Sequence, residues 1–186
     1  MRLFIALNFP KKERERIHRA ARPLREAEMP VRWVEPANYH ITLKFLDEVP
    51  EARVGAVVGA LESVAANTPP IELELGGFGA FPTIRRPRVI WLGADPSPAL
   101  RCLKQDIEWA LSDAGFPRET RAFHPHVTLG RAAEDGGAGA FRGLDELAAG
   151  LDYRGVVRVR SLDLMRSTLS RSGARYSIER SVTLGG

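Results

Sequence analysis

Cysteine is nearly absent from this sequence of 186 residues, which contains only Cys102. A single thiol excludes an intramolecular disulfide and a metal site built from several cysteines. Cys102 lies in a helical pattern, ALRCLKQDIEWAL, so we expect a buried or half-buried structural thiol rather than a nucleophile. No apolar run approaches the roughly 18 residues that a membrane-spanning helix needs. The composition therefore predicts a globular protein that binds no membrane.

Lysine is also scarce, because only four of the 27 basic residues are lysines and the rest are arginines. None of the four stands in a K-x-D-G run, where a nucleotidyl-transfer ligase would carry its nucleophile. No G-x-x-x-x-G-K-[ST] phosphate loop is present either. The sequence thus lacks the usual elements of an ATP-driven reaction. The four lysines are Lys11, Lys12, Lys44 and Lys104.

Acidic residues are sparse in one part of the chain. The formal net charge is +4. Between Arg154 and Arg180 there are seven arginines and only two acids, Asp163 and Glu179. A basic stripe of this kind attracts a polyanion without specifying which one, and a solvated strand face is the alternative interpretation.

The N-terminus, MRLFIALNFP, is apolar and is followed by charged residues from position 11 onward. A secretory leader has the opposite order, with charge first and a longer apolar region after it. We therefore expect the first residues to form a strand of the mature fold, and the protein to be cytoplasmic.

One four-residue pattern occurs twice: His40-Ile-Thr42-Leu and His126-Val-Thr128-Leu. The two copies are 86 residues apart. The same offset, without a gap, also superimposes other segments of like character: 2–7 on 88–93, 71–75 on 157–161, and 11–28 on 97–114. Several matches at one offset indicate an internal duplication. We predict a single domain over 1–186, made of two lobes at about 1–84 and 85–170 and a C-terminal strand at 174–184.

Each half shows the same order of elements. The expected order is an apolar strand (2–9; 87–94), a helix (11–27; 97–115), the motif strand (39–46; 125–131), a second helix (51–68; 141–151) and an alternating strand (71–75; 155–164). Gly- and Pro-rich loops are expected at 76–87, 93–98 and 134–141. The fold class is α+β: a duplicated bilobal fold with two pseudo-twofold related, mostly antiparallel sheets flanked by helices and an active cleft between the lobes.

The repeated motif points to acid–base chemistry on a phosphate. Side chains at i and i+2 of a strand share a face, so His40 and Thr42 project together, as do His126 and Thr128, while Phe45 would turn to the core. Two imidazoles can remove one proton and donate another near neutral pH. Threonine hydroxyls can hold the phosphate oxygens. Two His and two Thr make a poor zinc site, so we expect chemistry without metal or cofactor.

The motif segments HITLKFL and PHVTLGR resemble those of the 2H phosphoesterase superfamily. MRLFIALNFP and VRWVEPANYHITLKFL look like its bacterial and archaeal RNA 2′,3′-cyclic phosphodiesterase branch, also called 2′-5′ RNA ligase. The likeness covers essentially the whole chain, including GGFGAFP and GARYSIERSVTL. It implies a bilobal fold and hydrolysis of RNA 2′,3′-cyclic phosphate ends to 2′-phosphates, with 2′-5′ ligation as the reverse activity.

The resemblance also implies roles for the motif residues. His126 would be the general base acting on water, and His40 the general acid that protonates the departing 3′ oxygen. Thr42 and Thr128 would bind the phosphate. The site is nearly symmetric, so the roles of the two histidines can be exchanged for ligation.

Other residues are weaker candidates for contacts with substrate. Lys44 shares the predicted face of the first motif and would either reach the phosphate or solvate the cleft rim. Arg131 belongs to the second motif, although strict alternation would turn it away from the cleft. Further candidates for base stacking or phosphate pairing are Phe78, Phe81, Arg166 to Arg171 and Tyr176, with core packing as the alternative for the phenylalanines.

Two other functions fit the same sequence: a phosphodiesterase for a small cyclic nucleotide, and a non-catalytic module that binds RNA or nucleotides. Intact histidines and threonines in both motifs argue against the module. The expected partner is RNA with a 2′,3′-cyclic phosphate terminus, with nucleotides able to enter the cleft. We expect a monomer without an obligate protein partner.

Overall fold

The structure is a computed structural model that describes residues 1–185. Its strands are β1 (Arg2–Asn8), β2 (Val31–Trp33), β3 (His40–Glu48), β4 (Ile71–Pro82), β5 (Pro87–Ala94), β6 (His126–Ala132), β7 (Arg154–Val159), β8 (Ser161–Ser170) and β9 (Gly173–Thr183). Its helices are α1 (Lys11–Ala20), α2 (Arg22–Glu26), α3 (Glu51–Ala66), α4 (Pro98–Asp113) and α5 (Leu144–Gly150), with a 3₁₀ turn at Pro36–Asn38. The predicted α+β class is confirmed.

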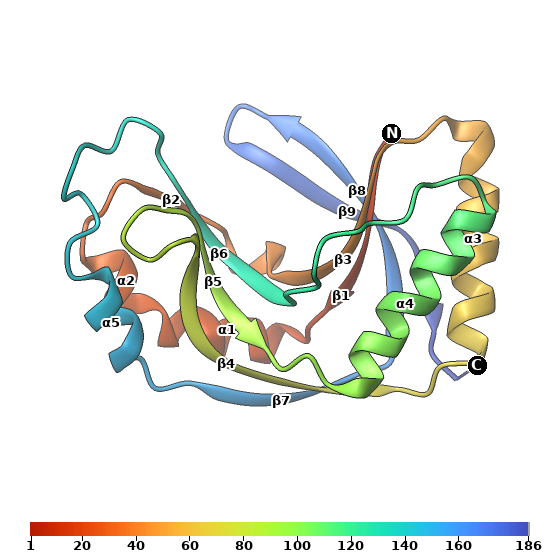
Figure 1. Cartoon of the computed structure of the whole chain (residues 1–186), viewed down its shortest axis with the longest axis horizontal. Coiled ribbons are helices and arrows are strands. Elements are labelled where there is room, and N and C mark those ends of the chain that lie inside the picture. The colour runs from red at the N-terminus through yellow and green to blue at the C-terminus, as the bar shows by residue number, and fades with distance from the viewer. Residues whose placement is uncertain (186) are drawn as a thin grey trace.

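The strands form one antiparallel sheet in the order β7-β4-β5-β6-β3-β1-β8-β9, and β2 pairs with β6. The two expected sheets are its two halves, which meet where β3 and β6 pair. Only one residue pair, Ile41 with Val127, is formed at that junction. The two halves therefore diverge from a narrow joint, and Figure 1 shows the strands of the two halves on either side of it.

The pairing registers show where the pseudo-twofold axis passes. Ile41 pairs with Val127, and Glu72 pairs with Arg158. The partners in each pair are 86 residues apart, so exchanging the two repeats maps each pair onto itself. Such self-matching contacts are the property of a twofold interface. The predicted pseudo-twofold relation is confirmed, and the first of its two pairs lies between the His-x-Thr motifs.

In space, each lobe takes elements from both repeats. The β8–β9 hairpin, from the second repeat, extends the sheet beside β1, whereas β4, from the first, lies beside β5. Helices α3 and α4 pack together on one side, and α1, α2 and α5 lie on the other (Figure 1). The division near residue 84 stays a prediction about the sequence repeats, because the lobes seen in space are not consecutive segments.

Local sequence signals explain where α4 begins and ends. The hydroxyl of Ser97 accepts a hydrogen bond from the backbone N–H of Leu100 at 3.2 Å, and Pro98 occupies the first helical position. Proline there costs no backbone hydrogen bond. After the helix, Gly115 has φ +94°, a left-handed conformation that suits glycine and ends the helix.

Strand β1 is buried on both faces, which explains its continuous apolar run. Leu3, Ile5 and Leu7 belong to the main core under the helices. Phe4 and Ala6 point to the opposite face, where they pack with Met165. This second, smaller cluster lies on the face that carries the histidine of the first motif, because the rings of Phe4 and His40 are 5.0 Å apart.

Two predictions about the secondary structure are wrong. The segment 76–87 was expected to be a loop, but β4 continues to Pro82 and pairs with β5. Gly77, at φ +79°, lies in a register shift between Leu75 and Phe78, after which pairing resumes. The single strand expected at 155–164 is two strands, β7 and β8, which pair with β4 and β1 respectively.

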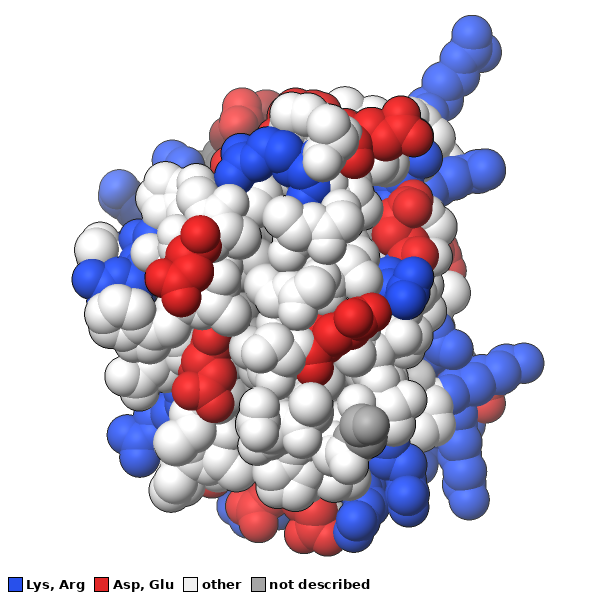
Figure 2. Space-filling view, turned by 90° about the vertical axis from the view of Figure 1, so that its right-hand side faces the viewer, with Lys and Arg blue, Asp and Glu red and all other residues white. Residues whose placement is uncertain are grey.

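The side of the molecule formed by α3 and α4 is shown in Figure 2. Its centre consists mostly of uncharged atoms, and the Lys and Arg side chains lie mainly at its margins. Within residues 1–185, no helix is long and apolar enough to cross a membrane. Within the described part of the chain, β9 corresponds to the strand predicted at 174–184 and pairs only with β8, at the edge of the sheet.

Candidate active site

Strand β3 contains a bulge directly after its His-x-Thr motif. Thr42 pairs with Ala6 on β1, whereas Lys44 pairs with the adjacent Ile5, so Leu43 is an extra residue on β3. A bulge of this kind interrupts the alternation of faces. Leu43 and Lys44 are therefore both buried, and alternation resumes beyond them in the opposite sense.

Strand β6 repeats this bulge at the equivalent place. Thr128 pairs with Trp91 on β5, whereas Gly130 pairs with Ile90, so Leu129 is the extra residue. Leu129 and Gly130 are both buried, as are their counterparts in β3. The duplication thus preserves the irregularity of the motif strand as well as its sequence.

The bulges decide which residue after the motif faces the cleft. Phe45, which was predicted to enter the core, is 62% exposed. Lys44 was predicted to share the face of His40, but it turns inward. Arg131, which strict alternation would turn away, lines the pocket with the motif residues. All three differences have one cause, because a bulge shifts the side-chain period by one residue.

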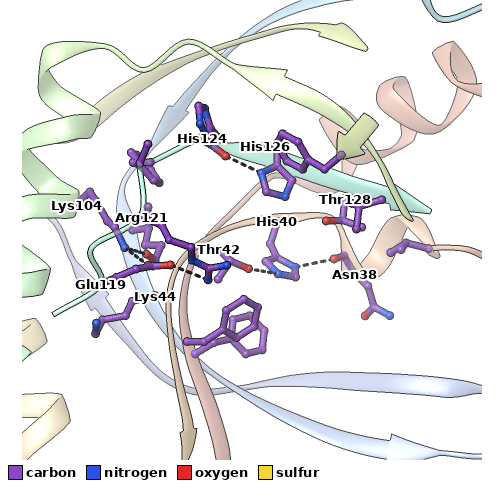
Figure 3. A pocket seen from close by; sticks show the side chains of 18 of the residues that line it. Asn38, His40, Thr42, Lys44, Lys104, Glu119, Arg121, His124, His126 and Thr128 are labelled. Atoms are coloured by element: carbon purple, nitrogen blue, oxygen red, sulfur yellow. Dashed lines mark hydrogen bonds and ion pairs between the residues drawn. The ribbon is translucent and has the colours of Figure 1, made fainter. Parts of the chain in front are cut away.

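A cavity of about 590 Å³ lies between the lobes and is lined by both motifs. Because the strands are antiparallel about the Ile41–Val127 pair, His40 lies on the same side of that pair as Thr128, and His126 on the same side as Thr42. Figure 3 shows the four side chains directed into this one space. The structure therefore brings together the four residues that the motifs predict.

Hydrogen bonds set the same tautomer in both histidines. Nδ1 of His40 lies 2.7 Å from the carbonyl oxygen of Asn38, and Nδ1 of His126 lies 2.7 Å from that of His124. A carbonyl oxygen only accepts, so each Nδ1 carries a proton. The other ring nitrogen, Nε2, is then the basic atom of the neutral ring. For His40 it lies 3.0 Å from the hydroxyl oxygen of Thr42.

Both imidazoles are poised to be neutral before substrate binds. Burial lowers the pKa of His40 to about 4; the hydrogen bond to Asn38 opposes this, and the charges of His126 and Arg131 reinforce it. Burial also lowers the pKa of His126, opposed by its hydrogen bond to His124 and reinforced by Arg131. Arg131 thus acts on both rings, and it lines the same cavity as they do. A bound anion would reverse the shift by favouring the charged rings.

Aromatic rings pack against each histidine. The ring of His40 lies 5.0 Å from Phe4 and 5.2 Å, edge to face, from Tyr176. The ring of His126 lies 5.1 Å from Phe81, also edge to face. Such contacts restrict ring rotation and remove water from one side of each imidazole. Phe4 was missed in the sequence, because an apolar residue in an apolar strand gives no functional signal.

The other predicted contact residues separate into two groups. Phe81 and Tyr176 line the cavity, and their contact with a base or phosphate stays a prediction. Phe78 instead packs with the buried core and against Tyr153. Arg166 pairs with Glu179 on the β8–β9 hairpin at 3.6 Å.

Lys44 borders the cavity, but its ammonium group is directed elsewhere. Its Nζ donates to both carboxylate oxygens of Glu108, at 2.9 and 2.8 Å, and to the carbonyl oxygen of Pro117 at 2.9 Å. These three acceptor oxygens use all three protons of the ammonium group. This geometry does not favour the predicted phosphate contact. Lys44 is better described as a residue that ties the motif strand to α4.

A second lysine completes this buried network, which the sequence did not reveal. Nζ of Lys104 donates to the carbonyl oxygen of the bulge residue Leu43 at 2.6 Å, to Glu108 at 2.9 Å and to Glu119 at 2.8 Å. In the sequence, Lys104 and Glu108 look like an ordinary i, i+4 pair on an exposed helix face. Only the fold shows that they hold the β3 bulge in place.

A pair of repeated strands that presents two histidines, two threonines and an arginine to one cavity defines a phosphoesterase of the 2H class. Among residues 1–185, no group of three or more His, Cys, Asp or Glu side chains is arranged to hold a metal ion. The family described as "LigT like Phosphoesterase" matches the chain twice, over residues 7–91 and 92–176. The chain belongs to this family, and the tandem match confirms the duplication.

Known proteins similar to this chain extend over most of its length. A protein of Aeropyrum pernix is 38% identical over 151 residues, covering 80% of this chain and 83% of the relative. A protein of Methanothermobacter thermautotrophicus is 31% identical over 182 residues, 95% of each chain. Both are named RNA 2′,3′-cyclic phosphodiesterase.

Solved structures show the same fold. The protein TT0787 of Thermus thermophilus superimposes with a TM-score of 0.83 at 25% identity, covering 100% of this chain and 99% of that one. Escherichia coli LigT, complexed with 3′-AMP, superimposes with a TM-score of 0.75 at 27% identity, covering 100% and 98%. The expected bilobal fold is thus shared along the whole chain.

Proposed function

We propose that this protein hydrolyses RNA 2′,3′-cyclic phosphate ends to 2′-phosphates by paired-histidine acid–base catalysis that requires no metal. The observation that carries the proposal is the convergence of two histidines, set in the same tautomer, on one cavity that also holds Arg131. The names of the Aeropyrum and Methanothermobacter relatives support the choice of substrate.

His126 acts as the general base. Its pKa is lowered by burial, so the ring is neutral at pH 7 and Nε2 can accept a proton. Nε2 removes that proton from a water molecule as the water oxygen attacks phosphorus. A neutral ring with a free lone pair on Nε2 is in the correct protonation state for this step.

His40 acts as the general acid on the opposite side of the phosphorus. Its Nε2–H donates a proton to the 3′ oxygen as the P–O3′ bond breaks, which leaves a 2′-phosphate and a 3′-hydroxyl. Since its pKa is about 4 before substrate binds, the ring must gain its proton on binding. The negative charge of the cyclic phosphate favours the protonated ring and supplies this coupling.

Arg131 and the two threonines hold the non-bridging oxygens. A guanidinium group can donate two parallel hydrogen bonds to a phosphate. The hydroxyls of Thr42 and Thr128 add neutral donors on either side of the Ile41–Val127 pair. Donors fixed before the reaction stabilise the charge that develops on the oxygens in the transition state. The same site would join RNA ends by a 2′-5′ linkage if a 5′-hydroxyl took the place of water.

The experiment is hydrolysis of an oligoribonucleotide with a 2′,3′-cyclic phosphate end, in the presence of EDTA. We expect a 2′-phosphate product, and a loss of about 10²- to 10⁴-fold in rate for His40→Ala and for His126→Ala, with binding retained. His18→Ala is the matched control, because His18 bonds to Tyr39 and does not line the cavity. A 3′-phosphate product, or dependence on added divalent metal, would contradict the proposal. Binding without turnover would favour the non-catalytic module.

A further inference from the structure

A second pocket adjoins the active cavity. It has a volume of about 530 Å³ and lies between α4 and the segment 118–123. We call it the α4 pocket. It shares four lining residues with the active cavity: Lys104, Glu119, Arg121 and Phe123. Figure 3 shows Lys104, Glu119 and Arg121 together on one side of the histidine pair. A chain leaving the active cavity on that side would enter the α4 pocket directly.

We propose that the α4 pocket binds the nucleotides on the 5′ side of the cyclic phosphate, so that this enzyme prefers RNA ends to cyclic mononucleotides. This inference rests on the proposed function and identifies its substrate as single-stranded RNA. The terminal nucleotide occupies the active cavity, and the preceding nucleotide passes Arg121 to reach α4.

An exposed aromatic and a stacked arginine form the outer wall of the α4 pocket. Trp109, on α4, is 49% exposed, which is unusual for so large an apolar side chain. The guanidinium carbon of Arg118 lies 4.1 Å from the centroid of the Trp109 ring. Single-stranded RNA is bound by stacking its bases on aromatic rings and on arginine planes. Trp109 holds Arg118 as a platform on which a base can stack.

The charges in the α4 pocket favour phosphate groups. Its acidic members, Glu108 and Glu119, are both bonded to lysines of the buried network. Arg121 also bonds to Glu119, so Arg101 and Arg118 leave an excess of positive charge in the lining. Concave sites with one sign of charge concentrate ligands of the opposite sign. The backbone phosphates of RNA are such ligands.

The segment that carries these arginines is held in place before RNA binds. The carboxylate of Glu119 accepts hydrogen bonds from Lys104 at 2.8 Å and from Arg121 at 3.1 Å. The backbone N–H of Glu119 donates to Glu108 at 2.8 Å. Because Lys104 and Glu108 are buried, the segment is fixed to the interior of the protein. A site organised in advance loses less conformational entropy on binding.

The experiment compares two substrates with the same terminal nucleotide: a 2′,3′-cyclic mononucleotide and a short single-stranded RNA with a 2′,3′-cyclic phosphate end. We expect a higher kcat/KM for the RNA. Trp109→Ala and Arg118→Ala should each lower kcat/KM for the RNA by about 10-fold, the loss of one stacked base. Both should leave the mononucleotide value within about twofold of the wild type, because neither residue lines the active cavity.

A matched control removes an arginine of the same charge elsewhere. Arg22, on α2, is 71% exposed and pairs only with Glu26 among the described residues. Arg22→Ala should leave both substrates unaffected. Arg118→Ala should also reduce the salt dependence of RNA binding, measured by fluorescence anisotropy, by about 0.7 in the logarithmic slope.

The outcomes separate this inference from the proposed function. Two results would overturn the proposed role of the α4 pocket and leave the proposed hydrolysis intact. One is equal kcat/KM for both substrates in the wild type, and the other is equal losses on both substrates in the variants. If neither the wild type nor any variant turned over either substrate, the proposed hydrolysis would be wrong. Weaker RNA binding by Trp109→Ala would still support the pocket in that case, and unchanged binding would overturn it.

Discussion

Arg131 and Phe45 occupy equivalent positions, five residues after the two motif histidines, and the equivalent bulges turn both to the cleft. The two repeats share the same backbone irregularity at this position but carry different side chains there. One lobe presents a guanidinium group that lowers the pKa of both histidines, and the other presents an exposed ring. This difference breaks the symmetry of the site at the residue scale, and it concentrates positive charge on the side of the second motif.

Arg131→Ala should lower kcat/KM by about 10²- to 10³-fold, because a fixed donor to the transition-state oxygens is lost. Arg131→Lys should restore part of this loss, since it keeps the charge but not the paired hydrogen bonds. Removal of the guanidinium should also raise the pKa of both His40 and His126, measured by NMR titration of the ring protons. Unchanged pKa values would show that Arg131 does not act on the pair.

The half-buried His40 makes stability depend on pH. Its pKa is about 4 in the folded protein, against an ordinary value of 6.5, so the unfolded chain binds the proton more readily. The free energy of unfolding should therefore fall as the pH drops from 6.5 to about 4, by on the order of 3 kcal/mol from this residue alone. Urea unfolding of wild type and His40→Asn across this range measures the difference. Parallel curves for the two proteins would contradict the assignment.

At the scale of elements, the buried ion network joins α4 to the bulge of β3. Glu108 is 9% exposed in its side chain and lies between Lys44 and Lys104. Replacing it leaves the buried ammonium of Lys44 without a carboxylate and that of Lys104 with Glu119 alone. Because Lys104 also bonds to Leu43, disorder in this network would move the strand that carries His40.

Glu108→Leu should reduce the free energy of unfolding by about 3–5 kcal/mol, measured by urea denaturation. Glu62→Leu is the control, since Glu62 pairs with Arg180 on the surface, where both side chains are more than half exposed. Its cost should stay below about 1 kcal/mol. Adding Lys44→Met to Glu108→Leu should recover part of the loss. Equal and small costs for the two glutamates would exclude a structural role for the network.

The sequence predicted those parts of the site that depend on local periodicity. His40 and Thr42, and likewise His126 and Thr128, share a face because side chains alternate along a regular strand. The prediction failed beyond Leu43 and Leu129, at Lys44, Phe45 and Arg131, because neither leucine carries a local signal for a bulge. The bulges appear only in the register with β1 and β5.

Predictions of elements failed for the same physical reason, since long-range pairing overrode local composition. The glycines of GGFGAFP predicted a loop, but pairing with β5 extends β4 through them. The chain from 155 to 164 reads as one alternating strand, yet its two parts pair with strands of different lobes. Lys104 and Glu108 gave no sign of burial, because their spacing is that of an exposed helical pair.

At the scale of the whole molecule, the duplication explains why two histidines meet at one phosphate. The pseudo-twofold axis passes through the Ile41–Val127 pair, so a residue next to one of these has its counterpart next to the other. A symmetric site binds a phosphate from both sides but does not by itself decide which histidine is the acid. The surroundings decide this, because Arg131 and the α4 pocket break the symmetry and orient the RNA.

A substrate with sulfur in place of the 3′ oxygen separates the two roles. A thiol has a pKa of about 8.5, so a departing thiolate needs no proton from the enzyme. His40→Ala should therefore be nearly inactive on the oxygen substrate but regain much of the wild-type rate on the sulfur substrate. His126→Ala should stay slow on both, since each reaction needs a base to activate water. The rates of the two variants on both substrates provide the measurement. If His126→Ala is the variant rescued by sulfur, the roles are exchanged, and the RNA lies across the cleft in the opposite direction.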